Sequence, residues 1–417
     1  MMSGKKSIRK NFMMNAVLTA SRLVFPLLTY PVVLRALGPG GMGRAGFAIS
    51  LASGVSVLSQ LGIPVYGVRA CARARDSREE LSRVAAELFM LSAAFGMAAF
   101  ALYSLAAAAV PRLREGQGLH MVAASVILLD AIGMEWLYKG LEEYGWITLR
   151  SLLCRAAAAA LMLLLIRSEA DCLAYVGLMV LAPGLSAIWN LIRSGRYVDR
   201  VLPRLLDVQG HIRPALTFFA MDCATAVYTN LDTAMLGFMA TDADIGCYHA
   251  ASRIKAVLVG IVTSLGAVLL PRASWYAGKG MKKEFMGLVR KALLWVLIFS
   301  IPAAAVSWLM AGTVIGLIAG PGFEGAVLPM KVLMLTLPLI GITNVLGIQM
   351  MVPLGRERTV LFSVAAGAVT DLALNLILIP AYGAAGAAVG TLIAEISVAA
   401  VQAVSAAGIV KEMRSDK

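Results

Sequence analysis

Charged and polar side chains occur inside long apolar runs of this sequence, where charge is expensive. One apolar run carries Asn230 and Asp232, a polar turn follows at 241–244, and the next run carries Arg253 and Lys255. A charge at mid-bilayer costs about 2.5–3.5 kcal/mol on insertion scales. These residues therefore indicate a binding cavity or a transport pathway. The alternative is a set of internal ion pairs that only hold helices together.

Further polar residues follow helical spacing in other apolar runs. Asn15 and Arg22 share one face near the start of the chain, and Arg22 lies about 15 Å inside its predicted helix at 1.5 Å per residue. Three acids occupy the interior of later runs: Asp222, Asp371 and Glu395. Seven or more such charges facing lipid would cost roughly 20 kcal/mol, more than a typical stability of about 5–15 kcal/mol. We expect them to face protein or water. Arg150, Asp130 and Glu135 are weaker candidates because each lies close to a predicted helix end.

Motifs of soluble enzymes and metal sites are missing from the sequence. The 5 cysteines and 3 histidines show no paired or metal-ligand spacing. No Walker A, HExxH or GxSxG pattern occurs. We therefore expect no enzymatic activity, no cofactor and no metal. Transport would then draw on an ion gradient, the membrane potential or the gradient of the substrate.

The composition sets the fold class. Of 417 residues, 59% are hydrophobic and 15% are charged, and the mean hydropathy is +0.80. Apolar runs of about 20 residues recur, each long enough to cross about 30 Å of hydrocarbon as a helix. The sequence predicts an all-α polytopic membrane protein with these twelve spans: 12–34, 45–66, 84–110, 119–138, 147–166, 172–192, 214–238, 246–270, 292–317, 329–353, 359–379 and 384–408.

Basic residues are distributed unequally between the two sides of this arrangement. Segments on the amino-terminal side hold 26 Lys and Arg residues, and the opposite segments hold five. Lys and Arg concentrate in cytoplasmic loops, so both termini are predicted to be cytoplasmic. The same bias accounts for most of the net charge of +13 without a nucleic-acid partner.

A basic connection divides the predicted spans into two sets of six. We expect an amino-terminal lobe at 1–192, a cytoplasmic linker at 193–213 and a carboxy-terminal lobe at 214–417. A weak internal similarity fits this division: in LRALGPGGMGRAGFAIS at 34–50 and in LGFMATDADIGCYHAAS at 236–252, a short outer turn leads to Gly43 and to Gly246. The similarity is either a parallel transporter repeat or a coincidence of short polar turns.

Several passages together resemble a known family. They are YPVVLRALGPGGMGRAGFA (30–48), LGIPVYGVRACARARDS (61–77), NLDTAMLGFMATDADIGCYHAASRI (230–254), SLGAVLLPRAS (264–274), MVPLGRERTVL (351–361) and NLILIPAYGAAGAAVGTLIAE (375–395). The chain resembles the polysaccharide-unit flippases, the Wzx type, of the multidrug/oligosaccharidyl-lipid/polysaccharide exporter superfamily. The resemblance implies two six-helix lobes that form a V around a central cavity and work by alternating access.

The resemblance also implies a substrate. This family moves undecaprenyl-diphosphate-linked oligosaccharide units across the bacterial inner membrane, with glycosyltransferases and a polymerase as expected partners. Arg22, Arg253 and Lys255 would then meet a diphosphate or an acidic sugar, with Asn15 and Asn230 beside them. The remaining acids would balance these cations or bind a coupling proton or sodium ion: Asp222, Asp232, Asp371 and Glu395.

Three rival functions remain open on the sequence alone. A drug/cation antiporter of the same superfamily would favour a cavity of acids and aromatic residues. A peptidoglycan-precursor flippase differs only in its substrate. A membrane-bound glycan polymerase or ligase usually needs a sizeable outer loop, and the predicted outer loops are short.

Overall fold

The computed structural model describes residues 8–199 and 207–415, and inside these ranges it leaves the side chains of some helical residues undescribed. The described chain consists of helices joined by short turns, and no strand occurs in it. Nine segments of the described chain are long and apolar enough to cross a membrane. The predicted all-α polytopic membrane fold is therefore confirmed.

The number of crossings exceeds the number of these segments. Met13–Ser59 and Glu357–Met413 contain 47 and 57 residues. At 1.5 Å per residue each is about twice as long as one crossing requires. Each is interrupted by one non-helical glycine, Gly38 (φ 63°) or Gly383 (φ 51°). With the 31-residue helix α9 (Gln209–Met239) the chain accounts for twelve crossings.

The chain folds into two compact units. The N-unit contains residues 1–37 and 44–230, and the C-unit contains residues 38–43 and 231–417. The chain passes between them at 37/38, at 43/44 and, within α9, at 230/231. The division of the sequence at the linker 193–213 stays a prediction, and residues 200–206 of that linker lie outside the described residues.

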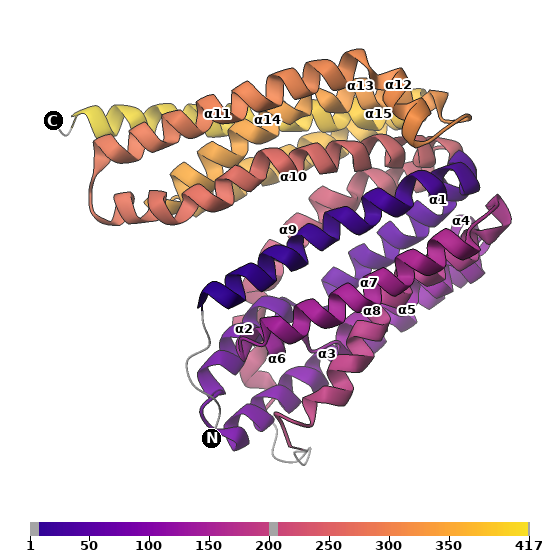
Figure 1. Cartoon of the computed structure of the whole chain (residues 1–417), viewed down its shortest axis with the longest axis horizontal. Coiled ribbons are helices and arrows are strands. Elements are labelled where there is room, and N and C mark those ends of the chain that lie inside the picture. The colour runs from indigo at the N-terminus through magenta and orange to yellow at the C-terminus, as the bar shows by residue number, and fades with distance from the viewer. Residues whose placement is uncertain (1–7, 200–206, 416–417) are drawn as a thin grey trace. The chain divides into compact units, whose positions relative to one another are not determined.

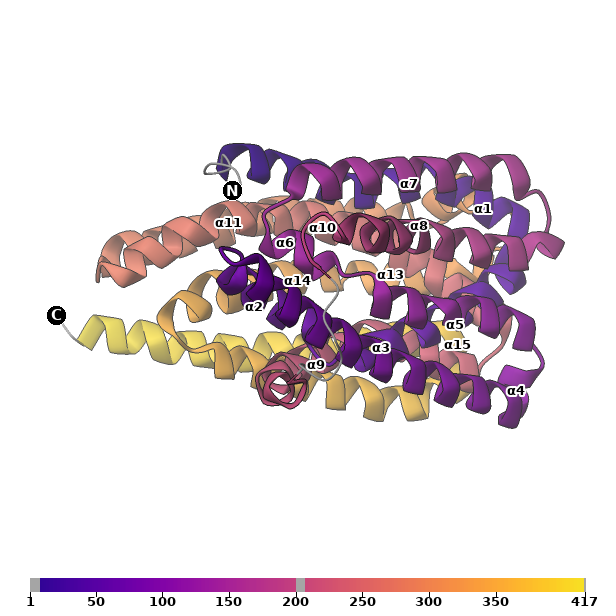
Figure 2. The ribbon, with the colours of Figure 1, turned by 90° about the horizontal axis from the view of Figure 1, so that it is seen from below.

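The N-unit is a bundle in which α3 packs on α5, α5 on α8, and α7 on α8 (Figures 1 and 2). Its elements, apart from the first part of α9, are α1 (Ile8–Ser59), α2 (Ile63–Ala74), α3 (Arg78–Ala109), α4 (Pro111–Arg114), α5 (Gln117–Ile132), α6 (Glu135–Gly140), α7 (Tyr144–Leu165), η1 (Glu169–Asp171) and α8 (Cys172–Ser194).

The C-unit packs α10 against α11 and α13, and α15 against α13 and α14 (Figure 1). Its elements, apart from the end of α9, are α10 (Asp242–Gly278), α11 (Lys282–Leu309), α12 (Ala311–Ile318), η3 (Glu324–Ala326), α13 (Val327–Met334), α14 (Thr336–Thr343), the π-helix η4 (Asn344–Met351), η5 (Val352–Leu354) and α15 (Glu357–Ser415).

Two predicted spans are interrupted by left-handed backbone. The span predicted at 45–66 ends at Ser59, because Leu61 (φ 50°) and Gly62 (φ 71°) stop the helix before α2 begins. Within the span predicted at 119–138, α5 ends at Ile132, because Met134 (φ 46°) separates α5 from α6, while the apolar segment continues to Gly140. A left-handed conformation is rare for leucine and methionine, so hydropathy alone could not locate these breaks.

The segment that contains Gly43 lies against the segment that contains Gly246, inside the C-unit. A Cβ on Gly43 would lie 1.7 Å from the carbonyl oxygen of Asp242, and one on Gly246 would lie 2.0 Å from the carbonyl oxygen of Pro39. The two contacts are reciprocal, since the same sequence offset relates Pro39 to Asp242 and Gly43 to Gly246. This reciprocity supports a true internal repeat.

Candidate functional site

Asp232 lies at the centre of a polar cluster within the C-unit. It is carried by α9, and its neighbours come from α10 and from both limbs of α15. Asn375 donates from Nδ2 to Oδ1 of Asp232 at 2.7 Å, and Thr391 donates from Oγ1 to Oδ2 at 2.9 Å. The Tyr248 hydroxyl also donates to Oδ2 and lies 3.2 Å from Oγ1 of Thr391. Three donors from three helical segments therefore converge on one carboxylate.

Two more acids and one lysine complete this group, which we call the Asp232 cluster. Asp371 and Glu395 are 5% and 4% exposed. Asp371 interacts electrostatically with Asp232 and with Glu395. Carboxylates that interact in a buried site disfavour each other's ionisation. Lys255 interacts electrostatically with all three acids.

Helix periodicity positions these side chains. Asp371 and Asn375 are one turn apart on the first limb of α15, and Thr391 and Glu395 are one turn apart on the second limb. Tyr248 precedes Lys255 by seven residues, or two turns, so α10 presents both on one face. The break at Gly383 lets the two limbs of α15 contribute to the same cluster.

A glycine provides the space for this arrangement. A Cβ on Gly390 would lie 2.3 Å from Oδ1 of Asn375 and 3.2 Å from Oδ1 of Asp371. Asn375 is fully buried, and its Nδ2 already binds Asp232, so its amide has little room to move. Any larger residue at position 390 would disturb the cluster.

The structure brings four of the nine predicted site residues together: Asp232, Lys255, Asp371 and Glu395. Lys255, predicted to meet an anionic substrate, instead lies beside three acids. Asn230 is half-buried on α9 and donates from Nδ2 to Oγ1 of Thr229 at 3.1 Å.

The other four predicted residues lie elsewhere or are not described. Arg253 is exposed on α10. Asn15 is exposed on α1, and Asp222 is half-buried on the part of α9 that belongs to the N-unit. The side chain of Arg22 lies outside the described residues.

Tyr248 is a member of the cluster that was not predicted from the sequence. Its two-turn spacing to Lys255 on α10 is a signal in the sequence that could have found it. The group around Arg150 is also more deeply buried than its predicted place near a helix end indicated. Arg150 is 1% exposed and donates from Nη2 to Oε2 of Glu135 at 3.0 Å and from Nη1 to Oδ1 of Asn190. A buried arginine so close to a helix end is visible only in the folded unit.

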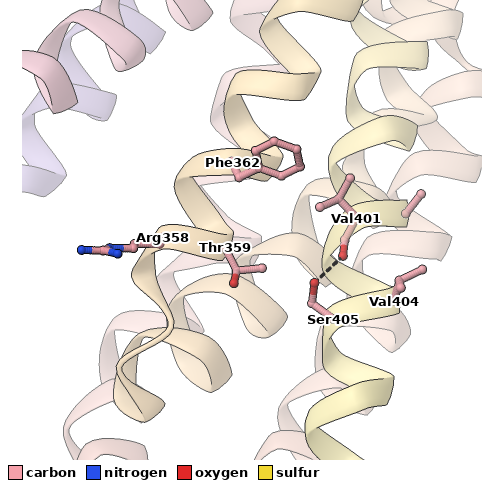
Figure 3. Close-up of a pocket in the computed structure, with 7 residues that line it drawn as sticks. Arg358, Thr359, Phe362, Val401, Val404 and Ser405 are labelled. Carbon is pink, nitrogen blue, oxygen red and sulfur yellow. Dashed lines mark hydrogen bonds between the residues drawn. The ribbon is translucent and has the colours of Figure 1, made fainter.

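A hollow lies on the surface of α15, away from the Asp232 cluster. Its volume is about 560 Å³, and Phe362, Val401 and Val404 line it (Figure 3). Ser405 donates from Oγ to the Val401 carbonyl oxygen at 2.9 Å, and Arg358 extends away from these residues in Figure 3. Phe362 and Val404 are 66% and 76% exposed, as suits a helix surface that faces lipid.

Metal chemistry has no support in the described residues. No group of three or more His, Cys, Asp or Glu side chains within them could hold a metal ion. The cysteines are all free thiols, at positions 71, 154, 172, 223 and 247.

Comparison with known proteins identifies the family. The profile described as "Polysaccharide biosynthesis protein" matches residues 5–276, which is more than half of the chain. The chain belongs to the polysaccharide biosynthesis protein family. A second profile, MatE, matches residues 218–377. The resemblance to the polysaccharide-unit flippases of the exporter superfamily is thereby confirmed.

Individual proteins agree with this family assignment. The chain is 23% identical over 399 residues to a protein of Escherichia coli (strain K12) named as an O-antigen transporter, and the match covers 95% of each chain. Relatives of this family member carry names of transporters and flippases rather than enzymes, as expected.

Solved structures show the same fold. An inward-facing multidrug resistance MATE family transporter of the MOP superfamily superposes with a TM-score of 0.79 at 15% identity, covering 97% of this chain and 99% of that one. The lipid II flippase MurJ in an inward closed conformation superposes with a TM-score of 0.68 at 17% identity, covering 95% and 87%. This family member is a multi-pass membrane transporter of polysaccharide biosynthesis.

Proposed function

We propose that the protein flips a lipid-diphosphate-linked oligosaccharide across the bacterial inner membrane by alternating access. The observation that carries the proposal is the match to an O-antigen transporter over 95% of both chains. The carrier lipid would be undecaprenyl diphosphate. Glycosyltransferases would act before the flipping step, and a polymerase would act after it. Both termini would lie in the cytoplasm, as the 26 basic residues on the terminal side indicate.

The Asp232 cluster is the proposed ion-coupling site, and we infer that the ion is a proton. Hard cations such as sodium and calcium need acceptor oxygens around them. Here Tyr248, Asn375 and Thr391 all direct donors at Asp232, and Lys255 already supplies a positive charge to the three acids. A proton shared between Asp232 and Asp371 fits this arrangement better than a metal ion.

The position of Asp232 connects protonation with movement. Loss of a shared proton would leave two interacting carboxylates charged, and their repulsion would weaken the packing of α9 on the first limb of α15. Asp232 is two residues from the point where α9 passes between the two units. A change in how α9 packs at Asp232 therefore acts where the chain connects the units.

The predicted anion-binding residues Arg22 and Arg253 are proposed to contact the diphosphate or an acidic sugar. The exposed position of Arg253 leaves its guanidinium accessible to a ligand. Arg binds phosphate with two parallel hydrogen bonds. Asn15 and Asn230 would add neutral hydrogen bonds, and Asp222 would balance charge on α9.

A second candidate function is export of organic cations coupled to an ion gradient. The MatE profile over residues 218–377 and the similarity to a multidrug transporter favour it. Two of the three acids of the Asp232 cluster, Asp232 and Asp371, lie within that matched region.

Leaflet-resolved flipping in proteoliposomes tests the two functions. The intact protein should flip a lipid-diphosphate-linked oligosaccharide, and Arg22→Ala and Arg253→Ala should lose this activity while folding normally. Arg272→Ala is the matched control, because Arg272 lies on the same helix as Arg253 but donates to Tyr276 at 3.0 Å. Normal flipping by both variants would refute the role of the arginines. Export of organic cations without glycolipid flipping would establish the second function instead.

A further inference from the structure

A second polar region, enclosed entirely within the N-unit, surrounds a cavity of about 440 Å³. This volume lies within the range of about 300–1,000 Å³ that is usual for small-ligand sites. The cavity is lined by the turn after α1, by the start of α2 and by α5, α6, α7 and α8. None of the nine predicted site residues lines it, whereas the three weaker candidates from the sequence do: Asp130, Glu135 and Arg150.

Charges of both signs line this cavity in nearly equal number. The acids are Asp130 and Glu135, and the basic residues are Lys139, Arg150 and Arg155. The side chains of Glu135 and Lys139 are each 36% exposed and pair at 2.9 Å, so water reaches this wall of the cavity. Ser56 donates to Oδ2 of Asp130 at 2.6 Å, which occupies one of its two oxygens.

Neutral hydrogen-bonding groups lie between these charges. Gln60, Ser151 and Ser186 line the cavity together with the ion pairs. Nε of Arg150 is buried and has no hydrogen-bond partner within the protein. A buried N–H group without a partner is unfavourable, and polar groups in such positions usually meet water or a ligand.

The backbone beside the cavity supports a polar occupant. Gly133 and Met134, at the interruption between α5 and α6, both line it. Asn190 donates from Nδ2 to the Gly133 carbonyl oxygen at 2.6 Å. Non-helical backbone within a membrane protein persists where it is buried in protein or lines a water-filled space. The interruption therefore fits a cavity that holds water or a polar ligand.

The mixture of groups selects one class of ligand. A diphosphate offers only acceptors, so it cannot donate to the second oxygen of Asp130 or to Glu135, whose charge Lys139 and Arg150 already balance. An organic cation such as tetraethylammonium offers no acceptor to Lys139, Arg150 or Arg155. A sugar ring carries hydroxyl groups that both donate and accept, and it can pair with every kind of group present.

We propose that this cavity binds one sugar ring of the transported glycan, a proposal that rests on the flippase function above. Gln60 and Ser186 donate to or accept from ring hydroxyls, the second oxygen of Asp130 accepts from a ring hydroxyl, and Lys139 and Arg155 donate to ring oxygens. The diphosphate is then bound elsewhere, so the protein reads sugar identity and lipid linkage at separate places.

The position of the cavity suits entry from the side where the amino terminus lies. Thr148 on α7 donates to the Met14 carbonyl oxygen at 3.0 Å, and Asn11 donates to Glu142 at 3.4 Å. The beginning of α1 therefore lies beside the ends of α6 and α7 that flank the cavity. The charge distribution predicts that this side is cytoplasmic, the side on which a glycan awaiting export is located.

Thiol labelling tests the proposal on the full-length protein in detergent. Ser186→Cys places a thiol on the cavity wall, and Ile188→Cys on the same helix is the control, since Ile188 is 46% exposed and does not line the cavity. The unsubstituted protein gives the background from its native thiols. Because the thiolate is the reactive form and needs water, a charged thiol reagent should label position 186 about tenfold faster than position 188.

Competition identifies the ligand class. The probes are a panel of hexoses, N-acetylhexosamines and uronic acids, with inorganic diphosphate and tetraethylammonium as the opposing ligands. At about twice its dissociation constant, at least one sugar should slow labelling at position 186 about threefold, while neither opposing ligand does so. Protection by diphosphate or tetraethylammonium, or by no sugar in the panel, would overturn the proposal. So would equal labelling at the two positions.

A filling substitution separates this proposal from the proposed function. Ser186→Trp should slow flipping of the glycan-bearing lipid about tenfold, and Ile188→Trp should not. Sugar protection in a protein that flips no glycolipid would retain the sugar site and refute the flippase function. Flipping by the intact protein together with normal flipping by Ser186→Trp would retain the function and refute the sugar site.

Discussion

Replacing Gly390 by alanine tests whether the Asp232 cluster tolerates any added atom. The new Cβ would lie 2.3 Å from Oδ1 of Asn375, well inside van der Waals contact. Asn375 is fully buried and bound to Asp232 at 2.7 Å, so relief requires that its amide move away from Asp232. Overpacking of this kind costs about 1–3 kcal/mol.

A control on the same helix separates the effect of the clash from the difference in helix propensity between alanine and glycine. Alanine is about 0.8–1.0 kcal/mol more favourable than glycine inside a helix. A Cβ on Gly408, also on α15, would meet no atom within 4 Å. Gly408→Ala should therefore gain the propensity term alone. The difference between the two variants isolates the clash, and we expect Gly390→Ala to be less stable than Gly408→Ala by about 1–3 kcal/mol.

Two assays read the outcome of this pair. Thermal unfolding in detergent compares stability, and proton-driven flipping in proteoliposomes compares function. Gly390→Ala should lose about tenfold or more in flipping, as an interaction change of about 1.4 kcal/mol implies, while Gly408→Ala keeps the rate of the intact protein. If the two variants were equally stable and equally active, the described contact between Gly390 and Asn375 would have no role, and the reasoning would be wrong.

Three further outcomes follow from individual side chains. Asp232→Asn should make flipping insensitive to an imposed pH gradient, whereas the control Asp199→Asn should leave that sensitivity unchanged. If Asp232→Asn still responded to the gradient, the Asp232 cluster would not be the proton-coupling site. Arg150→Ala should lower stability by about 1–3 kcal/mol, because it removes a hydrogen-bond donor from the buried Asn190 side chain, while Glu135 keeps its pair with Lys139. Arg78→Ala should leave stability nearly unchanged, because its pair with Asp199 is exposed. Chemical denaturation compares the two variants, and equal stabilities would contradict this reasoning. The hydrogen bond from Arg78 lowers the pKa of Asp199. This pair therefore stabilises the fold above the unfolded-state pKa of about 3.9, and the stabilisation is lost as pH falls through the lower folded-state pKa. Asp199→Asn should remove this small loss of melting temperature at acid pH, and an unchanged dependence of melting temperature on pH would contradict the reasoning.

The spans and their apolar character follow from the sequence because hydrocarbon imposes a simple requirement. Each crossing needs about 20 apolar residues in a helix, and few other solutions exist. For the same reason, a polar residue inside a span is conspicuous in the sequence itself. Asp232, Asp371 and Glu395 are recognisable in this way, and the spacing of Asp371 with Asn375 already places these two on one face of a helix.

The interruptions of the helices do not follow from hydropathy. Met134 is an apolar residue in an apolar run, and nothing in its type predicts a left-handed conformation. Its backbone is retained because Asn190, more than fifty residues later, binds the adjacent Gly133 carbonyl. Such long-range compensation belongs to the packed unit and leaves no periodic pattern in the sequence.

The sequence by itself determined that this is a helical membrane transporter, which of its runs cross the bilayer and which charges lie within membrane depth, because burial in lipid is decided residue by residue. Only the tertiary structure decided how those charges are grouped. Lys255 carries the positive charge expected of a side chain that binds phosphate, yet it lies among three acids contributed by α9 and by two limbs of α15. The cavity around Arg150 likewise draws on six separate segments of the N-unit. The partner of a buried charge is set by packing between distant segments, and no local pattern encodes it.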